Sequence, residues 1–254
     1  MSAEPPQPTG HQVGRDLWRG FRHLLYPATC GGCGALLPPT EDAFCPSCVQ
    51  ALTSDPFDTC PRCASTLGPF VVRSEAGCGR CRAQSFHFER VDRLGPYTGL
   101  LRELVLRCKQ PGGEGLAARL GELWAAHAGP RLAAMHADLV VPVPLHWRRR
   151  WWRGFNQSEV LAEALARAVC LPCWSAAVRR IRPTPQQTAQ PAAQRLENVR
   201  GAFRAKPSPR LEGRTVLLVD DVLTTGSTAS EAAGALKAAG AARVVVAVVA
   251  HDRA

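Results

Sequence analysis

The sequence lacks any apolar run long enough to span a lipid bilayer, and its first residues do not follow the basic-then-apolar order of a secretion signal. We therefore expect a cytoplasmic protein with no segment inserted in a membrane. A chain of 254 residues can bury a sizeable core, either as one large domain or as two small ones. The spacing of the cysteines favours two.

Acidic residues are too few in the second part of the chain to balance its basic residues. Residues 1–90 contain eight Lys or Arg and eight Asp or Glu, so the whole formal net charge of +10 lies beyond residue 90. A basic domain of this kind fits an anionic ligand, a nucleic acid or both, and charge alone does not separate these partners.

Eight of the eleven cysteines form four CxxC pairs near the N-terminus. Without a secretion signal, this spacing favours metal over disulfides. Two pairs supply the four thiolates that zinc takes in a closed structural site, which leaves no open position for catalysis. Pairing the first with the second and the third with the fourth closes the shortest loops, and a cross-braced arrangement is the alternative. The predicted ligands of two Zn²⁺ ions are Cys30, Cys33, Cys45, Cys48, Cys60, Cys63, Cys78 and Cys81.

These patterns predict three parts: a disordered tail over residues 1–14, a helix and double zinc ribbon over residues 15–90, and an α/β domain over residues 91–254. Strand and helix patterns alternate in the last part, which predicts a mostly parallel sheet. The expected strands lie within residues 91–97, 139–145, 216–219 and 243–249. The expected helices cover residues 15–26, 100–108, 116–127, 157–169 and 229–239.

The segment Val216–Thr228 joins a buried strand, two adjacent carboxylates and a loop of hydroxyls and glycine. An apolar strand would present Asp220 and Asp221 at its carboxyl end, where open α/β sheets bind ligands and where carboxylates can accept hydrogen bonds from ribose hydroxyls. The next helix would offer a phosphate its first-turn amides and its dipole. The alternative is an ordinary strand, turn and helix. The loop consists of Thr224, Thr225, Gly226, Ser227 and Thr228. The whole segment resembles the phosphoribosyl pyrophosphate motif of type I phosphoribosyltransferases.

Residues 139–145 begin as a buried strand and end with two prolines, which prevent pairing in a central strand and fix a rigid loop. Proline also lowers the cost of a cis peptide. In position, the loop resembles the pyrophosphate loop of type I phosphoribosyltransferases, so Pro142, Val143 and Pro144 are candidate ligand-binding residues, with a plain strand end as the alternative. Lys109 is a further candidate for a phosphate contact, against the alternative of a solvated surface lysine.

The run Trp147–Arg153 interleaves four arginines with three tryptophans and contains no acid. Arginines pair with phosphates and indoles stack on bases, as in proteins that bind single-stranded nucleic acid. The alternative is a loop beside the pyrophosphate whose tryptophans pack on the core.

Two further features follow in the chain. Cys170 and Cys173 form a fifth CxxC pair that has no partner pair, and we expect a buried structural role for them. Residues 179–214 contain nine Lys or Arg and two Glu, which predicts a mobile basic loop, with a disordered linker as the alternative.

Taken together, these residues resemble the ComF family of phosphoribosyltransferase-like proteins, which are associated with natural competence and DNA uptake in bacteria. Two positions depart from the pattern: Gln190 stands where relatives usually have leucine, and Pro and Gly rather than an aromatic residue follow Lys109. The resemblance implies an α/β fold of the type I phosphoribosyltransferase kind, a parallel sheet with a hood, preceded by zinc ribbons. It rests on the CxxC pairs, Pro142–Pro144, Arg153–Gln157, Arg180-x-Arg-x-Thr-x-x-Gln187, Arg195–Asn198 with Phe203, and Asp220–Thr228.

The resemblance also implies roles. Asp220 and Asp221 would hold the ribose hydroxyls of phosphoribosyl pyrophosphate, and residues 224–228 its 5-phosphate. Arg180, Arg182 or Lys109 would bind the pyrophosphate together with Mg²⁺, stabilising it as it leaves the anomeric carbon. Some purine-salvage relatives carry an acid at the position of Thr224, and its absence here weakens such a role.

Three functions therefore remain open at the level of the sequence. The first is a transferase with an unspecified acceptor. The second is a non-catalytic accessory of natural transformation that binds single-stranded DNA. The third is a zinc module that docks other competence proteins.

Removing the metal should unfold the cysteine-rich module, because few apolar residues lie between its CxxC pairs. We expect a chelator that removes zinc to change the circular dichroism of the protein. A spectrum that stays unchanged after complete loss of zinc would contradict a structural role for the metal.

Overall fold

The computed structural model describes residues 28–38, 43–68, 71, 74, 76–79, 81, 84–183 and 199–252. The predicted tail over residues 1–14 and the predicted helix over residues 15–26 lie outside these ranges. Residues 184–198 of the predicted basic loop also lie outside them, among them Thr184, Gln187, Arg195 and Asn198. Among the described residues, no helix is long and apolar enough to cross a membrane.

The chain divides into two compact units, Met1–Gln50 and Ala51–Ala254. Helix α2 (Pro46–Thr53) spans the point of division. The second unit contains the third and fourth CxxC pairs as well as the sheet. The domain boundary that we expect at residue 90 stays a prediction.

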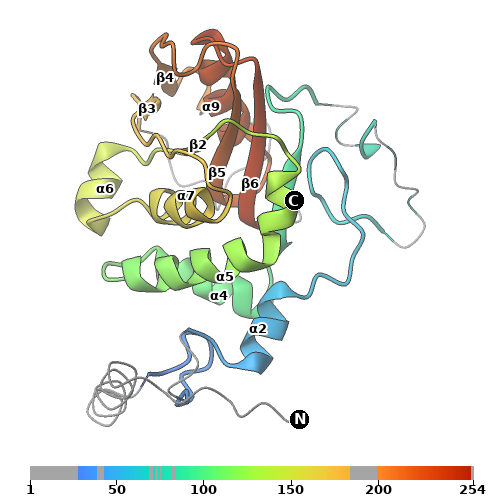
Figure 1. Cartoon of the computed structure of the whole chain (residues 1–254), viewed down its shortest axis with the longest axis vertical. Coiled ribbons are helices and arrows are strands. Elements are labelled where there is room, and N and C mark those ends of the chain that lie inside the picture. Colours follow the sequence, from blue (N-terminus) through green and yellow to red (C-terminus); the bar gives the residue numbers. More distant parts are fainter. Residues whose placement is uncertain are drawn as a thin grey trace, which may run out of the picture. The chain divides into compact units, whose positions relative to one another are not determined.

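A four-stranded parallel sheet forms the centre of the second unit (Figure 1). Its strands are β1 (Val91–Pro96), β6 (Arg243–His251), β5 (Thr215–Leu223) and β2 (Leu139–Pro142), in that spatial order. The two middle strands are nearly continuous apolar runs because helices cover both faces of the sheet. Pro142, which cannot donate to a ladder, ends a strand at the edge of this sheet, as the two prolines predicted.

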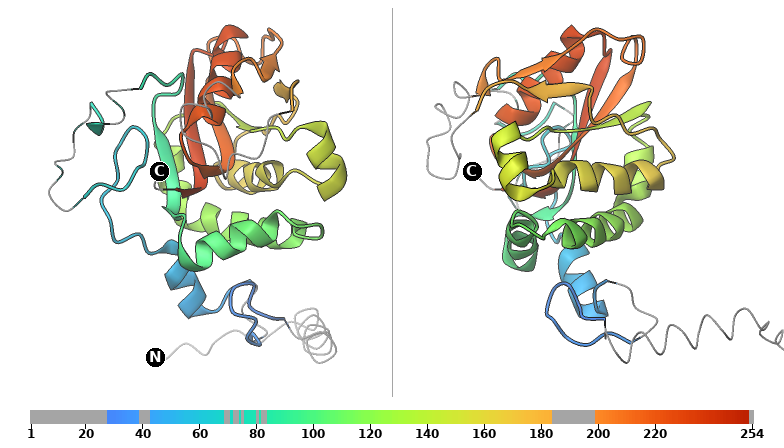
Figure 2. Two further views of the ribbon diagram at one scale, coloured as in Figure 1. Left: turned by 180° about the vertical axis from the view of Figure 1, so that it is seen from behind. Right: turned by 90° about the vertical axis from the view of Figure 1, so that its left-hand side faces the viewer.

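The helices of the second unit lie on both faces of this sheet. Crossovers from β1 to β2 and from β5 to β6 run in opposite directions, so right-handed connections place their helices on opposite faces. Helix α7 packs on α5 and on β2 and β5, apart from α9, as Figures 1 and 2 show. The helices are α4 (Gly99–Cys108), α5 (Glu114–Ala133), α6 (Trp147–Arg153), α7 (Gln157–Ala168) and α9 (Ser227–Ala238).

The structure corrects the predicted end of the central strand. We expected the strand to end at Val219, with both carboxylates beyond it, but β5 continues to Leu223. The reason is that β6 continues to His251 and provides partners in register, so that Asp220 lies opposite Val248. Asp220 and Asp221 therefore belong to a paired strand, which holds their backbone more firmly than a loop would.

A loop is the alternative interpretation of residues 147–153 and the prediction for residues 179–214, and the structure corrects both in part. Residues 147–153 form helix α6, capped by the His146 side chain at its start and ended by Gly154 at φ 87°. The ends of the predicted mobile loop form an antiparallel pair, β3 (Val178–Arg180) with β4 (Phe203–Ala205). Among the described residues all peptide bonds are trans, including those at the prolines of the loop after β2.

Helix α7 begins with a side-chain cap. Asn156 is its N-cap, and its side-chain oxygen accepts a hydrogen bond from the backbone N–H of Ser158. The buried role expected for the fifth CxxC pair is wrong for Cys170, which is exposed, and Cys173 is only half-buried.

The eight N-terminal cysteines form two groups of four, and these follow the sequential pairing. A tetrahedral zinc ion with Zn–S bonds of about 2.3 Å would place its sulfurs about 3.8 Å apart. The Sγ atoms of Cys30 and Cys45 lie 3.7 Å apart, and those of Cys60 and Cys81 lie 3.8 Å apart. Both groups therefore fit structural zinc, and the cross-braced alternative is wrong.

Candidate functional site

A cavity of ≈ 550 Å³ opens at the carboxyl end of the parallel sheet. All four strands contribute to its wall. Tyr97 follows β1, Val143 and Pro144 follow β2, the end of β5 supplies Asp220 and Asp221, and Asp252 follows β6. This is the edge at which parallel sheets place ligands, and the volume suits a small metabolite.

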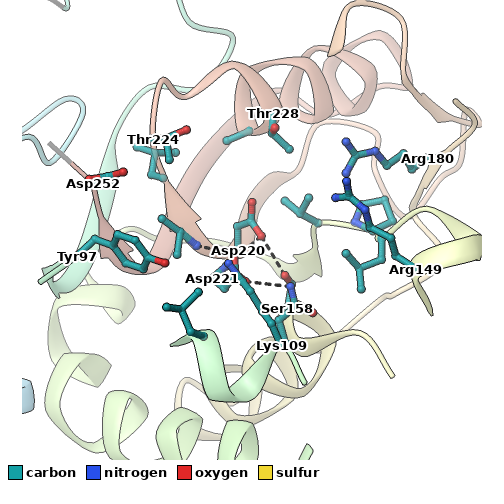
Figure 3. Close-up of a pocket in the computed structure, with 18 of the residues that line it drawn as sticks. Tyr97, Lys109, Arg149, Ser158, Arg180, Asp220, Asp221, Thr224, Thr228 and Asp252 are labelled. Carbon is teal, nitrogen blue, oxygen red and sulfur yellow. Dashed lines mark hydrogen bonds and ion pairs between the residues drawn. The ribbon is translucent and has the colours of Figure 1, made fainter. Parts of the chain in front are cut away.

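Two carboxylates lie in the middle of the cavity wall (Figure 3). Asp221 Oδ2 lies 3.1 Å from Lys109 Nζ and accepts a hydrogen bond of 2.9 Å from Gln157 Nε2. Its Oδ1 accepts from the backbone N–H of Val222. Asp221 is therefore held on both oxygens, and Lys109 is an ion-pair partner rather than a solvated lysine.

Asp220 is held on one oxygen only. Its Oδ1 accepts from Ser158 Oγ and from the backbone N–H of Asp221, both at 2.9 Å. Within the described part of the chain, Oδ2 of Asp220 takes part in no hydrogen bond or ion pair with another residue. That oxygen is available to a ligand in the cavity.

The two neighbouring carboxylates have opposite pKa shifts. Burial, together with the charge of Asp221, raises the pKa of Asp220 to about 7. Burial would also raise the pKa of Asp221, but the Lys109 ammonium and the hydrogen bonds from Gln157 and Val222 lower it below its ordinary value. At neutral pH, Asp221 is thus charged and Asp220 is near its titration midpoint.

A group of arginines forms a second part of the wall. Arg149 and Arg153 come from α6, and Arg180 comes from β3. Burial lowers the pKa of both Arg180 and Arg153, and the nearby positive charge of Arg149 lowers both further. Figure 3 shows Arg149 and Arg180 on the same side of the cavity, away from Tyr97 and Asp252. Cations held together in this way favour a ligand group that carries several negative charges.

The start of helix α9 forms a third part of the wall. Gly226 is the N-cap residue with φ 81°, a left-handed conformation that favours glycine. Thr224, Gly226 and Thr228 line the cavity. Thr225 and Ser227 are buried behind it, where their hydroxyl groups hydrogen-bond to each other at 2.8 Å. Three of the five predicted loop residues therefore reach the cavity, and the other two hold the turn.

The structure brings most of the predicted ligand-binding residues together, but not all of them. Arg182 is exposed, does not line the cavity, and donates a hydrogen bond of 2.8 Å to the carbonyl oxygen of Arg200. Pro142 is buried in β2 and does not line the cavity. The predicted residues that do line it are Lys109, Val143, Pro144, Arg180, Asp220, Asp221, Thr224, Gly226 and Thr228.

Sequence reasoning missed several residues of the wall. The run of arginines and tryptophans predicts a contact with nucleic acid, with a loop beside the pyrophosphate as the alternative, and it does not single out Arg149. Ser158, in the first turn of α7, could have been recognised as a polar residue directed at a strand end. Asp252 could have been found by the rule that identified Asp220, because it also directly follows a buried strand.

Helix α6 presents an aromatic surface to solvent. Trp147, Trp151 and Trp152 are 65%, 84% and 61% exposed, so the alternative in which they pack on the core is wrong. The guanidinium of Arg148 lies over the Trp147 ring at 5.3 Å. Exposed indoles are costly unless a partner covers them, and indoles beside arginines suit stacked bases.

Comparison with known proteins gives two matching family models. The model described as a phosphoribosyl transferase domain matches residues 156–254, and the one described as a double zinc ribbon domain matches residues 21–86. The predicted fold class, a parallel sheet of the phosphoribosyltransferase type preceded by a cysteine-rich zinc-ribbon module, is thereby confirmed.

Curated relatives match over most of the chain. DNA utilization protein YhgH of Escherichia coli (strain K12) is 34% identical over 226 residues, which cover 88% of this chain and 96% of the relative. Competence protein F of Haemophilus influenzae is 30% identical over 221 residues, with 85% and 94% covered. Among solved structures, a glutamine phosphoribosylpyrophosphate amidotransferase from B. subtilis is 27% identical, with 52% of this chain and 25% of that chain covered and a TM-score of 0.35.

The adjacent carboxylates should respond in opposite ways to neutralisation. The folded-state pKa of Asp220 lies above its unfolded value, so the charged group lowers stability as the pH rises from about 4 towards 7. We expect Asp220→Asn to raise the free energy of unfolding by about 2 kcal/mol at pH 8 and by less at pH 5. Urea unfolding at both pH values measures this difference.

The matched control is Asp221→Asn. The lowered pKa of Asp221 means that its charge stabilises the folded protein above pH 4 and that this contribution is lost at lower pH. Removing that charge leaves Lys109 without its partner, so we expect a loss of roughly 1–3 kcal/mol at pH 8. An Asp220→Asn protein that is less stable than the wild type at pH 8 would contradict the raised pKa.

Proposed function

Because the chain belongs to the ComF family of competence-associated, phosphoribosyltransferase-like proteins, we propose that its cavity binds phosphoribosyl pyrophosphate with Mg²⁺. We further propose that the protein transfers the phosphoribosyl group to an acceptor and releases pyrophosphate. The observation that carries this proposal is the separation of carboxylates, arginines and a helix N-terminus around one cavity.

The three parts of the wall complement the three parts of phosphoribosyl pyrophosphate. The start of α9 suits the 5-phosphate, because its first-turn amides and dipole favour an anion. The group formed by Arg149, Arg153 and Arg180 suits the pyrophosphate, which carries the most charge. Between them, Asp220 and Asp221 suit the uncharged ribose diol, whose hydroxyls donate hydrogen bonds.

The network around Asp220 prepares it for this role. Ser158 and the backbone N–H of Asp221 occupy Oδ1, so Oδ2 can accept a hydrogen bond from a ribose hydroxyl. Asp220 Oδ2 is also a hard oxygen ligand of the kind that Mg²⁺ takes beside substrate phosphates. Bound there with the ligand's phosphates, the ion would neutralise charge on the pyrophosphate.

The same geometry supports transfer. When the bond between the anomeric carbon and the pyrophosphate oxygen breaks, positive charge develops on the ribose and negative charge on the leaving group. Asp220 and Asp221 lie on the ribose side and the arginines on the pyrophosphate side, so each charge develops beside groups of opposite sign. The acceptor supplies the electron pair of the new bond to the anomeric carbon.

Calorimetric titration of the full chain with phosphoribosyl pyrophosphate and Mg²⁺ tests the binding proposal. We expect Arg149→Gln to weaken this binding by 10-fold to 100-fold, since a charged hydrogen bond contributes about 1.5–3 kcal/mol. Ribose 5-phosphate, which lacks the pyrophosphate, should bind both proteins equally. The control is Arg150→Gln, because Arg150 pairs with Glu159 and does not line the cavity.

The outcomes separate binding from catalysis. A wild-type protein that does not bind phosphoribosyl pyrophosphate would refute the binding proposal. Binding without release of pyrophosphate across a panel of nitrogen-containing acceptors would refute transfer and leave a binding protein.

A second function is favoured by the exposed tryptophans of α6. We propose that this helix binds single-stranded DNA, with bases stacked on Trp147 and Trp151 and phosphates paired with Arg148. Its charge is complementary to a nucleic acid, since α6 contains no acid. The names of the relatives in Escherichia coli and Haemophilus influenzae point to the same context.

Binding of a fluorescent oligothymidine measures this function. We expect Trp151→Ala to weaken binding by about 5-fold to 100-fold, because stacking contributes about 1–3 kcal/mol per base. Affinity should also fall steeply with salt, and this salt dependence should decrease in Arg148→Gln. Equal affinities for wild type and Trp151→Ala would show that α6 is not the binding surface.

A further inference from the structure

The segment Phe86–Phe88 connects the second cysteine group to the core of the same compact unit. Phe86 packs against the cysteine cluster formed by Cys60, Cys63, Leu67 and Cys81, and it also packs against the main core beside the sheet. Its ring stacks on the Phe88 ring with 4.7 Å between centroids. Phe86 is thus shared between the second cysteine group and the core.

The same ring lies against the start of helix α9. A Cβ atom added to Gly226 would lie 3.0 Å from Cε1 of Phe86 and 3.5 Å from Cζ of Phe88. The position of these rings therefore limits where the backbone of Gly226 can lie. Since Gly226 lines the cavity at the start of α9, the rings support the loop from behind.

Hydrogen bonds hold the segment in place along α9. The backbone N–H of His87 donates to Ser230 Oγ at 3.0 Å, and Ser230 N–H donates to the carbonyl oxygen of Gly226 at 2.8 Å. The His87 ring lies against Gly234, whose added Cβ would be 3.0 Å from it. Residues 86–88 and the first two turns of α9 therefore form one packed structure.

A second connection runs from the same cysteine group to the last strand. Ser65 Oγ lies 3.1 Å from Cys63 Sγ and 3.3 Å from Nε2 of His251, which is only 2% exposed. The next residue, Asp252, lines the cavity, and its backbone N–H donates to the carbonyl oxygen of Leu223. Two walls of the cavity are thus in contact with the structure around one cysteine group.

In the part of the chain that the structure describes, the cysteine cluster has little apolar surface besides its cysteines. Among the described residues, Leu67 is the one buried hydrophobic member of this cluster apart from its cysteines, and Phe86 is the partly buried member that is not a cysteine. Four thiols with so few neighbours depend on metal for their arrangement. Loss of the metal would therefore disturb one of the two clusters on which Phe86 packs.

We propose that the second cysteine group, loaded with zinc, is the support of the phosphate-binding loop, and that Phe86 is the positioning residue between them. This inference rests on the proposed binding of phosphoribosyl pyrophosphate, and it adds that zinc at this site controls affinity for that ligand. The first cysteine group belongs to the other compact unit, so it provides the comparison for this proposal.

The two cysteine groups provide matched variants. We expect Cys60→Ser with Cys63→Ser, and likewise Cys30→Ser with Cys33→Ser, to reduce the zinc content from two ions to one. The first variant should weaken binding of phosphoribosyl pyrophosphate at least 10-fold and speed amide hydrogen exchange over residues 224–230. The variant with Cys30→Ser and Cys33→Ser should change neither the affinity for phosphoribosyl pyrophosphate nor the rate of amide exchange over residues 224–230. Equal behaviour of the two variants in both measurements would overturn the proposal.

Phe86 variants test the inference with both zinc ions retained, which matters if the cysteine variants do not fold. We expect Phe86→Ala to keep two zinc ions, to exchange faster over residues 224–230 and to bind at least 10-fold more weakly, and Phe86→Leu to restore most of both properties. Unchanged exchange in Phe86→Ala would overturn the role of Phe86. Exchange needs no ligand, so a wild-type protein that fails to bind phosphoribosyl pyrophosphate would refute the proposed function without deciding this one.

Discussion

The ion pair between Lys109 and Asp221 is the interaction on which the site depends. Two carboxylates on adjacent residues of a buried strand cannot both be charged without a cation, since burial and mutual repulsion oppose it. Lys109 at 3.1 Å resolves this conflict for Asp221 alone, and Asp220 then titrates near neutral pH. The site thereby keeps one fixed charge and one carboxylate with an oxygen available to a ligand.

The parallel sheet turns this pair into a site with distinct ends. Because β5 continues through both carboxylates, paired with β6, their backbone positions are fixed relative to the start of α9. Arg149 and Arg153 come from α6, and the three tryptophans of the same helix are exposed to solvent. One short helix therefore faces the cavity with some of its arginines and solvent with its indoles, which places the two proposed functions next to each other.

Local patterns in the sequence predict much of the fold and part of the site. Apolar runs followed by carboxylates identified the strands and Asp220, and the CxxC spacing identified both cysteine groups with the correct pairing. The sequence could not reveal the partner of Lys109, which lies 112 positions before Asp221 and meets it only through the fold. For the same reason no local pattern in the sequence marks Phe86, whose proposed role comes from its contacts with Gly226 and the cysteines.

The central claim is that one cavity binds phosphoribosyl pyrophosphate in a single orientation, with its two charged ends at different walls. Phosphorus NMR tests it directly, because the 5-phosphate and the pyrophosphate give separate resonances. With Mg²⁺ present, wild-type protein should shift and broaden all of these resonances, and Arg149→Gln should reduce the effect on the pyrophosphate while that on the 5-phosphate persists. Equal loss of both effects in Arg149→Gln, or no effect of the wild-type protein, would contradict the account.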